Sequence, residues 1–239
     1  MRELPAQHLQ YQHKRPTIAY FPGSITIPYF MTLWRGIVDA AEAARVNLIS
    51  VEGRKLHSSY ESDIQSNILY ELIHSGNIDG LLIQDAVGHF ASPEALKNFA
   101  QRYSPLPVIS LGMNLPGIPR ILYEEFQSMR SAVTHLIEVH NLRRIAFIQG
   151  PVQADSSRER FRGYCDALAA NNLSVEPALI TPGDYTQAAG EQAIHLLLNE
   201  RKVKFEAVVA ANDEMAFGAM KALRSHEMDV PGDVAVIGF

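Results

Sequence analysis

The chain has 239 residues, a formal net charge of −5 and one cysteine, Cys165, so an internal disulfide is excluded. Its lysine and arginine residues are scattered, which excludes a general electrostatic surface for nucleic acids, and no stretch approaches the roughly 18 apolar residues of a membrane span. Because residues 1–14 also lack the apolar core of a secretory signal, we expect a cytoplasmic protein without a membrane partner, long enough to form two lobes.

Short apolar runs rich in Ile, Val and Leu alternate with longer segments of helical period, after a polar tail at residues 1–14 that we expect to be disordered. Most runs are nearly continuous, which is typical of strands that are covered on both faces. The predicted strands are Thr17–Phe21, Asn47–Val51, Gly80–Gln84, Pro107–Leu111, Arg120–Tyr123, Arg144–Gln149, Ala178–Thr181, Ala207–Ala211 and Val234–Gly238. This alternation predicts stacked βαβ units.

The intervening segments predict helices. The first two have apolar residues at helical spacing, namely Phe30, Trp34, Ile37 and Ala41 behind Pro28, and then Ile64, Ile68, Leu72 and Ile73. Ser92 and Pro93 are the expected N-cap and first turn of a third helix. Later helices are expected over Ser128–His140, Ser157–Asn171, Thr186–Arg201 and Asp213–Glu227, with Asp213 as a possible cap of the last one.

The series of βα units restarts near residue 142, after four units, and three more precede a final strand. The predicted fold class is therefore α/β, with two doubly wound parallel-sheet lobes: an N-terminal lobe over residues 15–141 and a C-terminal lobe over residues 142–239. The last residues, Asp233–Phe239, form a strand pattern with nothing behind it, so we expect a C-terminally truncated fragment whose second lobe is incomplete.

Ligands of open parallel sheets gather outside the carboxyl ends of the strands, where loops and helix N-termini meet. In the second half of the chain, Asn212 and Asp213 follow an apolar strand, Tyr185 lies in a strand-to-helix loop, and "SSRERFRGY" offers Arg158, Arg160 and Arg162. An amide, a ring and a guanidinium suit a hydroxylated ligand. The alternatives are that Asn212 and Asp213 only cap a helix, that Tyr185 packs on its own lobe, and that the arginines form a solvated face.

In the first half, Tyr29 and Phe30 follow the first strand and form the matching aromatic pair, while Gln84 and Asp85 follow the third strand. Phe30 also lies on the helical stripe, so core packing is its alternative role. No phosphate-binding glycine loop or nucleophile elbow is present, the histidines are not at metal-ligand spacing, and Cys165 lies on an apolar stripe. We expect no cofactor, no metal ion and no catalytic residues.

Five ordered segments resemble the effector-binding core of the LacI/GalR family, which is related to the periplasmic sugar-binding proteins: "HLIEVHNLRRIAFIQGP", "RERFRGYCDAL", "PGDYTQAAG", "VVAANDEMAFGAMKAL" and "DVPGDVAVIGF". The likeness covers nearly the whole chain from Arg15 to Phe239. It implies a hinged, type I periplasmic-binding-protein-like fold whose two lobes close a cleft around a small-molecule effector, such as a sugar or a nucleoside.

The resemblance also implies residue roles. Arg160 matches the arginine that holds the effector, Tyr185 the aromatic that stacks on it, Asn212 and Asp213 the "ND" pair at the cleft, and Tyr29 with Phe30 the first-lobe contacts. Glu124 stands where the family usually has an aspartate. The chain lacks the helix-turn-helix of family repressors, which implies that it does not itself contact DNA, and it stops one residue short of an aspartate that commonly contacts the ligand.

These observations predict the effector-sensing domain of a LacI-type transcriptional regulator that binds its ligand without catalysis, with a homodimer as one assembly open to it. The longer "VHNLRRIAF" resembles sensor domains fused upstream of signalling outputs, so the alternative is an input module for a diguanylate cyclase or a histidine kinase. A third alternative is an enzyme on a similar scaffold, because fold alone does not determine function.

Overall fold

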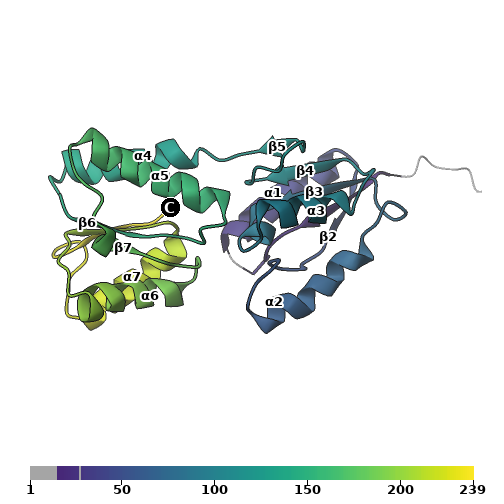
Figure 1. The fold of residues 1–239 in the computed structure, drawn as a ribbon. Coiled ribbons are helices and arrows are strands. Elements are labelled where there is room, and N and C mark those ends of the chain that lie inside the picture. The colour runs from purple at the N-terminus through teal and green to yellow at the C-terminus, as the bar shows by residue number, and fades with distance from the viewer. Residues whose placement is uncertain (1–14, 27) are drawn as a thin grey trace, which may run out of the picture.

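The computed structural model describes residues 15–26 and 28–239 and contains two parallel sheets, each in its own lobe (Figure 1). The predicted tail at residues 1–14 lies outside the described residues. The first sheet has five strands in the order β2-β1-β3-β4-β5, and the second has four in the order β7-β6-β8-β9. Because strands are added on both sides of β1 and of β6, both lobes are doubly wound, and the predicted α/β fold class is confirmed.

The strands of the first sheet are β1 (Thr17–Phe21), β2 (Asn47–Ser50), β3 (Gly80–Gln84), β4 (Val108–Leu111) and β5 (Arg120–Ile121). Ala19 pairs with Ile49 on one side and with Leu81 on the other, which fixes the parallel register. One face of this sheet packs on an aromatic cluster of Phe21, Tyr70, Phe99 and Tyr103, whose neighbouring ring centroids lie 4.7 to 6.2 Å apart. This cluster forms the core of the first lobe.

The helices of the first lobe are α1 (Pro28–Ala43), α2 (Glu61–Ser66), the 3-10 helices η1 (Asn67–Leu72) and η2 (Asp85–Gly88), and α3 (Pro93–Gln101). The predicted cap of α3 is confirmed, because the Ser92 hydroxyl accepts a hydrogen bond from the backbone N–H of Ala95 at 3.2 Å. Among the described helices, none is both long and apolar enough to cross a lipid bilayer.

The second lobe contains β6 (Ile145–Ile148), β7 (Ile180–Thr181), β8 (Ala207–Ala210) and β9 (Ala235–Ile237). Its helices are α4 (Glu125–Glu138), α5 (Asp155–Ala170), η3 (Pro177–Leu179), α6 (Gln187–His195), its π-helical continuation η4 (Leu196–Glu200), and α7 (Asp213–Ser225). Every residue of β6 and β8 is buried. The continuous apolar runs predicted as strands covered on both faces therefore form the centre of this sheet.

Helix α4 belongs to the second lobe, so the predicted boundary between residues 141 and 142 falls too late in the chain. Met129 and Val133 of α4 are fully buried in the same core as Phe147, and α4 lies along α5 (Figure 1). The restart of the βα series predicted that this helix packs on the first sheet, together with the strand that precedes it. The chain instead crosses to the second lobe between β5 and α4. We therefore place the boundary before α4, at residues 122–124.

The second predicted apolar stripe is not core. Ile64, Ile68 and Leu72 are between 59% and 67% exposed, and only Ile73 of the predicted set is buried. The α-helical turns of α2 give way to the 3-10 turns of η1, whose period of three residues turns Tyr70 and Ile73 toward the core instead. The three exposed residues, which we call the α2 stripe, form an apolar surface on the first lobe.

The crossing of α4 and α5 depends on Gly163. A Cβ atom there would lie 2.5 Å from the carbonyl oxygen of Phe126 and 3.0 Å from the backbone nitrogen of Arg130, so the two helices would have to move apart. We expect Gly163→Ala to lower the free energy of unfolding by about 1–3 kcal/mol, as measured by urea denaturation. Gly36→Ala is the matched control, because a Cβ on this residue of α1 meets nothing within 4 Å and gains helix propensity. Equal effects of the two substitutions would contradict this packing.

Candidate functional site

The carboxyl ends of the two sheets meet at a narrow crevice between the lobes. The backbone N–H of Asn114 in the first lobe donates to Asp155 in the second at 2.7 Å, and the rings of His89 and Tyr185 are 4.9 Å apart across it. The cavity between Asp85 and Asp155 measures only about 20 Å³, room for one water molecule. A wider hollow of about 470 Å³ lies beside it at the ends of β6 and β7, under Phe90 of the first lobe. The narrow part of the crevice is thus largely filled by its own side chains, whereas the hollow beside it has the volume of a small-molecule site.

Arg160 of α5 is held at the crevice by three partners. Its guanidinium donates to the Glu125 carboxylate and to the carbonyl oxygen of Ala211, and it stacks on the ring of Phe239 at 3.8 Å from the ring centroid. Its side chain is only 12% exposed. The alternative that Arg160 belongs to a solvated basic face is therefore wrong, whereas Arg162, which is 62% exposed, fits it.

Tyr185 lies in the loop before α6 and is enclosed by both lobes. A Cβ on Gly150 would lie 2.5 Å from its ring, so this glycine provides the space that the ring fills. Its hydroxyl is 2.9 Å from Ser156 Oγ, and burial raises the pKa of Tyr185 to about 12, so it remains protonated at neutral pH. The backbone of Tyr185 has φ +70°, a conformation that costs free energy in a non-glycine residue and is found preferentially at functional sites.

Asn212 fixes this loop while it caps α7. Its Oδ1 accepts from the backbone N–H of Met215 at 3.0 Å, and its Nδ2 donates to the carbonyl oxygen of Tyr185 at 3.1 Å. Asn212 is thus the N-cap, as the simpler alternative held, and the expectation that Asp213 caps the helix is wrong. Asp213 instead faces the end of β9, where its backbone N–H donates to Phe239 O at 3.2 Å.

The predicted residues of the first lobe have different surroundings. Gln84 is fully buried behind the crevice, with its Oε1 3.4 Å from both the Tyr20 hydroxyl and the backbone nitrogen of Gly23, so it joins the ends of β1 and β3. Asp85 lines the crevice, with one carboxylate oxygen 3.8 Å from His89 Nε2. The structure therefore brings Asp85, but not Gln84, to the cavity.

Tyr29 and Phe30 lie at the edge of the crevice. Their ring centroids are 5.1 Å apart, and the Tyr29 ring is 6.5 Å from that of Tyr123. Burial of its hydroxyl and a hydrogen bond with Tyr123 raise the pKa of Tyr29, while the nearby charge of Arg160 opposes this shift. Tyr29 is therefore within the electrostatic reach of Arg160, and Phe30 packs beside it.

Buried polar atoms without a hydrogen-bond partner are concentrated around the crevice. In the described part of the chain they belong to Glu52, Gln84, Asp85, His89, Glu125 and Ser157. These residues lie at or just after the ends of β2 and β3, or in the first turns of α4 and α5. They are therefore found where the carboxyl ends of both sheets lie. Because native proteins pair nearly all buried polar groups, such a concentration is typical of a site that a polar ligand completes.

Sequence reasoning missed Glu125, Tyr123 and His89. The neighbouring Glu124 was singled out, but its side chain is exposed, and it is Glu125 that meets Arg160. The helix predicted from Ser128 begins one turn earlier, at Glu125, and this earlier start turns the carboxylate inward. An acidic residue in a first helical turn, where the helix dipole favours it, was the signal that could have identified it.

Comparison with known proteins places the chain in a family. The family model described as periplasmic binding proteins and sugar binding domain of the LacI family matches residues 13–239. The HTH-type transcriptional regulator AscG of Escherichia coli (strain K12) is 32% identical over 212 residues, 88% of this chain and 60% of the relative. The crystal structure of the E. coli repressor ascG covers 94% of this chain and 78% of its own, at 31% identity and a TM-score of 0.69.

A second relative extends the likeness. The HTH-type transcriptional regulator CelR of Thermobifida fusca is 29% identical over 89% of this chain and 59% of its own length. A structure of a CelR–cellobiose complex is 26% identical, with a TM-score of 0.75 over 94% of this chain and 68% of that chain. The chain thus spans about three fifths of the length of these two curated relatives.

Both relatives are described as transcriptional regulators, and neither as a cyclase or a kinase, so the alternative of a signalling input module finds no support. The predicted resemblance and the two-lobed fold that it implied are confirmed. The chain belongs to the family of periplasmic binding proteins and LacI-type sugar-binding domains, and it corresponds to the effector-binding domain of a LacI-family transcriptional regulator.

Proposed function

We propose that this domain senses a small hydroxylated effector, a sugar or a nucleoside, which binds in the crevice between the lobes and favours their closed arrangement. The observation that supports this most strongly is the convergence of Arg160, Tyr185 and Asp85 with unpartnered polar atoms at the facing sheet edges. The complex of the relative CelR with cellobiose supports a sugar in particular. The DNA-binding step of the regulator would reside elsewhere in a longer protein, as the shared length with the relatives suggests.

Each residue has a role that follows from its surroundings. Arg160 presents a planar guanidinium that suits bidentate contact with ligand oxygens. The Tyr185 ring offers an apolar surface for one face of a sugar or base. Asn212 holds the Tyr185 loop in its strained conformation, which leaves Tyr29 and Phe30 to cover the ligand from the first lobe.

We infer that the domain binds its ligand without turning it over. The relatives are regulators rather than enzymes. Within the crevice, the hydroxyl of Ser156 is paired with Tyr185 and not with a histidine or a carboxylate that would activate it as a nucleophile. The ligand would act on an equilibrium in the cytoplasm, through its higher affinity for one arrangement of the lobes.

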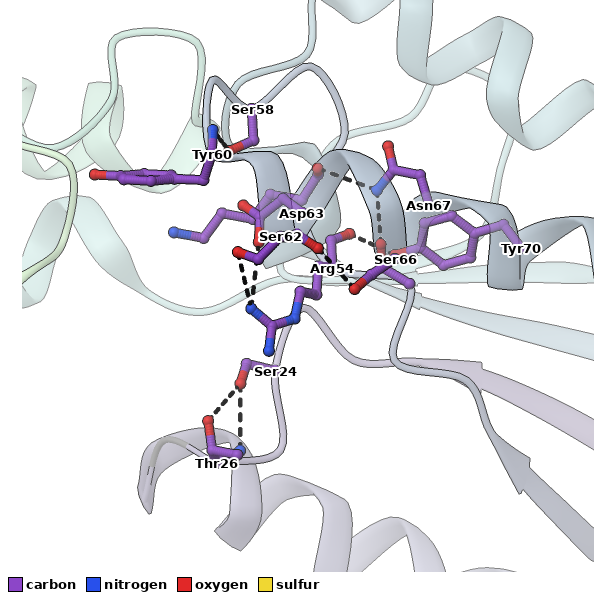
Figure 2. Close-up of polar contacts among 12 residues, drawn as sticks. Ser24, Thr26, Arg54, Ser58, Tyr60, Ser62, Asp63, Ser66, Asn67 and Tyr70 are labelled. Atoms are coloured by element: carbon purple, nitrogen blue, oxygen red, sulfur yellow. Dashed lines mark hydrogen bonds and ion pairs between the residues drawn. The ribbon is translucent and has the colours of Figure 1, made fainter.

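A hydrogen bond between the two lobes, which we call the latch, would hold their closed arrangement at the rim of the crevice. The hydroxyl of Tyr60 in the first lobe donates to Asp184 of the second at 2.9 Å, and Figure 2 shows Tyr60 pointing away from the polar side chains of α2 and η1, such as Asp63 and Asn67. Burial raises the pKa of Asp184, but hydrogen bonds from Thr186 and Tyr60 more than offset this and hold it below its ordinary value. Asp184 therefore stays ionised at neutral pH, and the latch is lost only as the pH falls through that lowered pKa.

We also propose that the domain forms a homodimer through the first lobe. The α2 stripe exposes three large apolar side chains, Ile64, Ile68 and Leu72, within nine residues of the chain, and exposed apolar surface of this kind marks interaction surfaces. We expect Ile64→Glu combined with Ile68→Glu to halve the mass measured by light scattering, at an unchanged melting temperature. A wild-type chain that is already monomeric at micromolar concentration would contradict the proposal.

A thermal-shift screen of sugars and nucleosides tests the proposed effector, because a ligand that binds only the folded protein raises its melting temperature. With a ligand from this screen, Arg160→Lys should weaken calorimetric affinity by about 1–3 kcal/mol, because it keeps a charge beside Glu125 but loses the planar fork. Arg162→Lys on the exposed face of α5 is the matched control. Equal affinities of both variants and the wild type would refute the site, and a screen without any ligand would refute the effector class.

The latch is tested by a double-mutant cycle. Tyr60→Phe removes only the hydroxyl of a side chain that is half exposed, so the fold should persist while the lobes open more often. We expect a larger radius of gyration in X-ray scattering and an affinity for the screened ligand weakened by about 0.5–1.5 kcal/mol. Asp184→Asn and the double variant complete the cycle, and strictly additive effects would show that no coupling exists between the two residues.

A further inference from the structure

The charge of Arg160 is already balanced inside the protein. Glu125 accepts a hydrogen bond from its Nε, and the two side chains are only 12% and 7% exposed. Glu125 also stands in the first turn of α4, where the helix dipole stabilises its negative charge. A ligand that reaches Arg160 therefore meets a neutral pair and not an open cation.

The remaining carboxylates at the crevice lack a cation. Oε1 of Glu125 and Oδ1 of Asp85 are buried without any hydrogen-bond donor. The other carboxylate oxygen of Asp85, Oδ2, lies 3.8 Å from Nε2 of His89, and both ring nitrogens of His89 lack hydrogen-bond partners. These carboxylate oxygens are acceptors, so the groups that complete them must donate hydrogen bonds.

The second arginine of the crevice is also engaged. Arg158 pairs with Asp155 and donates to the carbonyl oxygens of Val152 and Gln153. Lys55 lies at the edge of the neighbouring hollow, over the Phe90 ring at 5.2 Å, where burial lowers its pKa while the charges of Asp63 and Asp184 oppose that shift. Both arginines of the crevice are therefore paired with carboxylates of the protein itself.

Resting on the proposed function, we infer that the crevice selects an uncharged, hydroxyl-rich ligand such as a neutral sugar and rejects its phosphorylated or carboxylated forms. Hydroxyl groups of such a ligand can donate hydrogen bonds to the unpartnered oxygens of Glu125 and Asp85. A phosphate or carboxylate at Arg160 would lie close to the carboxylate of Glu125, so that one buried negative charge would face another.

Inorganic phosphate is the probe that tests this charge selection, in the wild-type chain and in Glu125→Gln, an isosteric change that removes the internal counter-charge of Arg160. Melting temperatures are compared in phosphate and in chloride at equal ionic strength and fixed pH. We expect no phosphate effect in the wild type, and in Glu125→Gln an apparent phosphate affinity at least about tenfold higher. Glu138→Gln, an exposed position on the same helix, is the matched control and should behave as the wild type.

Each outcome decides the inference. Phosphate binding by the wild type overturns it, because Arg160 would then be open to anions, and phosphate binding by neither protein overturns it, because Glu125 would not be what excludes them. If Glu125→Gln does not fold, Asp85→Asn takes its place in the same comparison with the same expected gain.

Glucose and glucose 6-phosphate, added to the wild type, extend the test to a matched sugar pair, and stabilisation by the phosphate form also overturns the inference. If no neutral sugar or nucleoside binds, the proposed function fails while the phosphate comparison still decides the charge selection.

Discussion

The buried contact between Arg160 and Glu125 fixes the position of the guanidinium at the point where the crevice opens. It joins α5 to α4, and through the carbonyl of Ala211 and the ring of Phe239 it reaches the ends of β8 and β9. Such a pair adds little net stability, because both charges must leave water, but loss of one partner costs about 3–5 kcal/mol. Its consequence is positional: the guanidinium is held near Tyr185 before any ligand arrives, so little ordering is needed when the ligand binds.

The fold was predictable where periodicity and apolar runs decide it. All nine predicted strands are present, with ends that differ by no more than two residues, because strands covered on both faces have a strong apolar signal. The lobe boundary was not predictable, since the sequence of α4 does not reveal which sheet its buried face meets. The prediction that the α2 stripe belongs to the core was wrong for a related reason. Apolar residues at helical spacing indicate a face that is covered, but they do not show whether a core or another molecule covers it.

The position of the candidate site in the fold was partly predictable. Arg160, Tyr185, Asn212 and Asp85 were expected near one another because they follow strands whose carboxyl ends share an edge, and their role in binding a ligand stays a prediction. The sequence does not reveal which side chains meet across the fold. It does not show that Arg160 contacts Glu125 rather than solvent, or that Asn212 supports Tyr185 in addition to its local role as a cap. Nor does it show that Gln84 lies behind the site. The long-range contacts join residues 27 to 64 positions apart, where local patterns give no register.

A ligand bound between the lobes would complete the polar groups that the protein alone leaves unpaired. The most direct measurement is a crystal structure of the domain with a sugar that raises its melting temperature. We expect the sugar against the ring of Tyr185, with hydroxyls bound to Arg160 and Asp85 and with Glu125 still paired to Arg160. A sugar bound outside the crevice, with these side chains unchanged, would contradict this expectation.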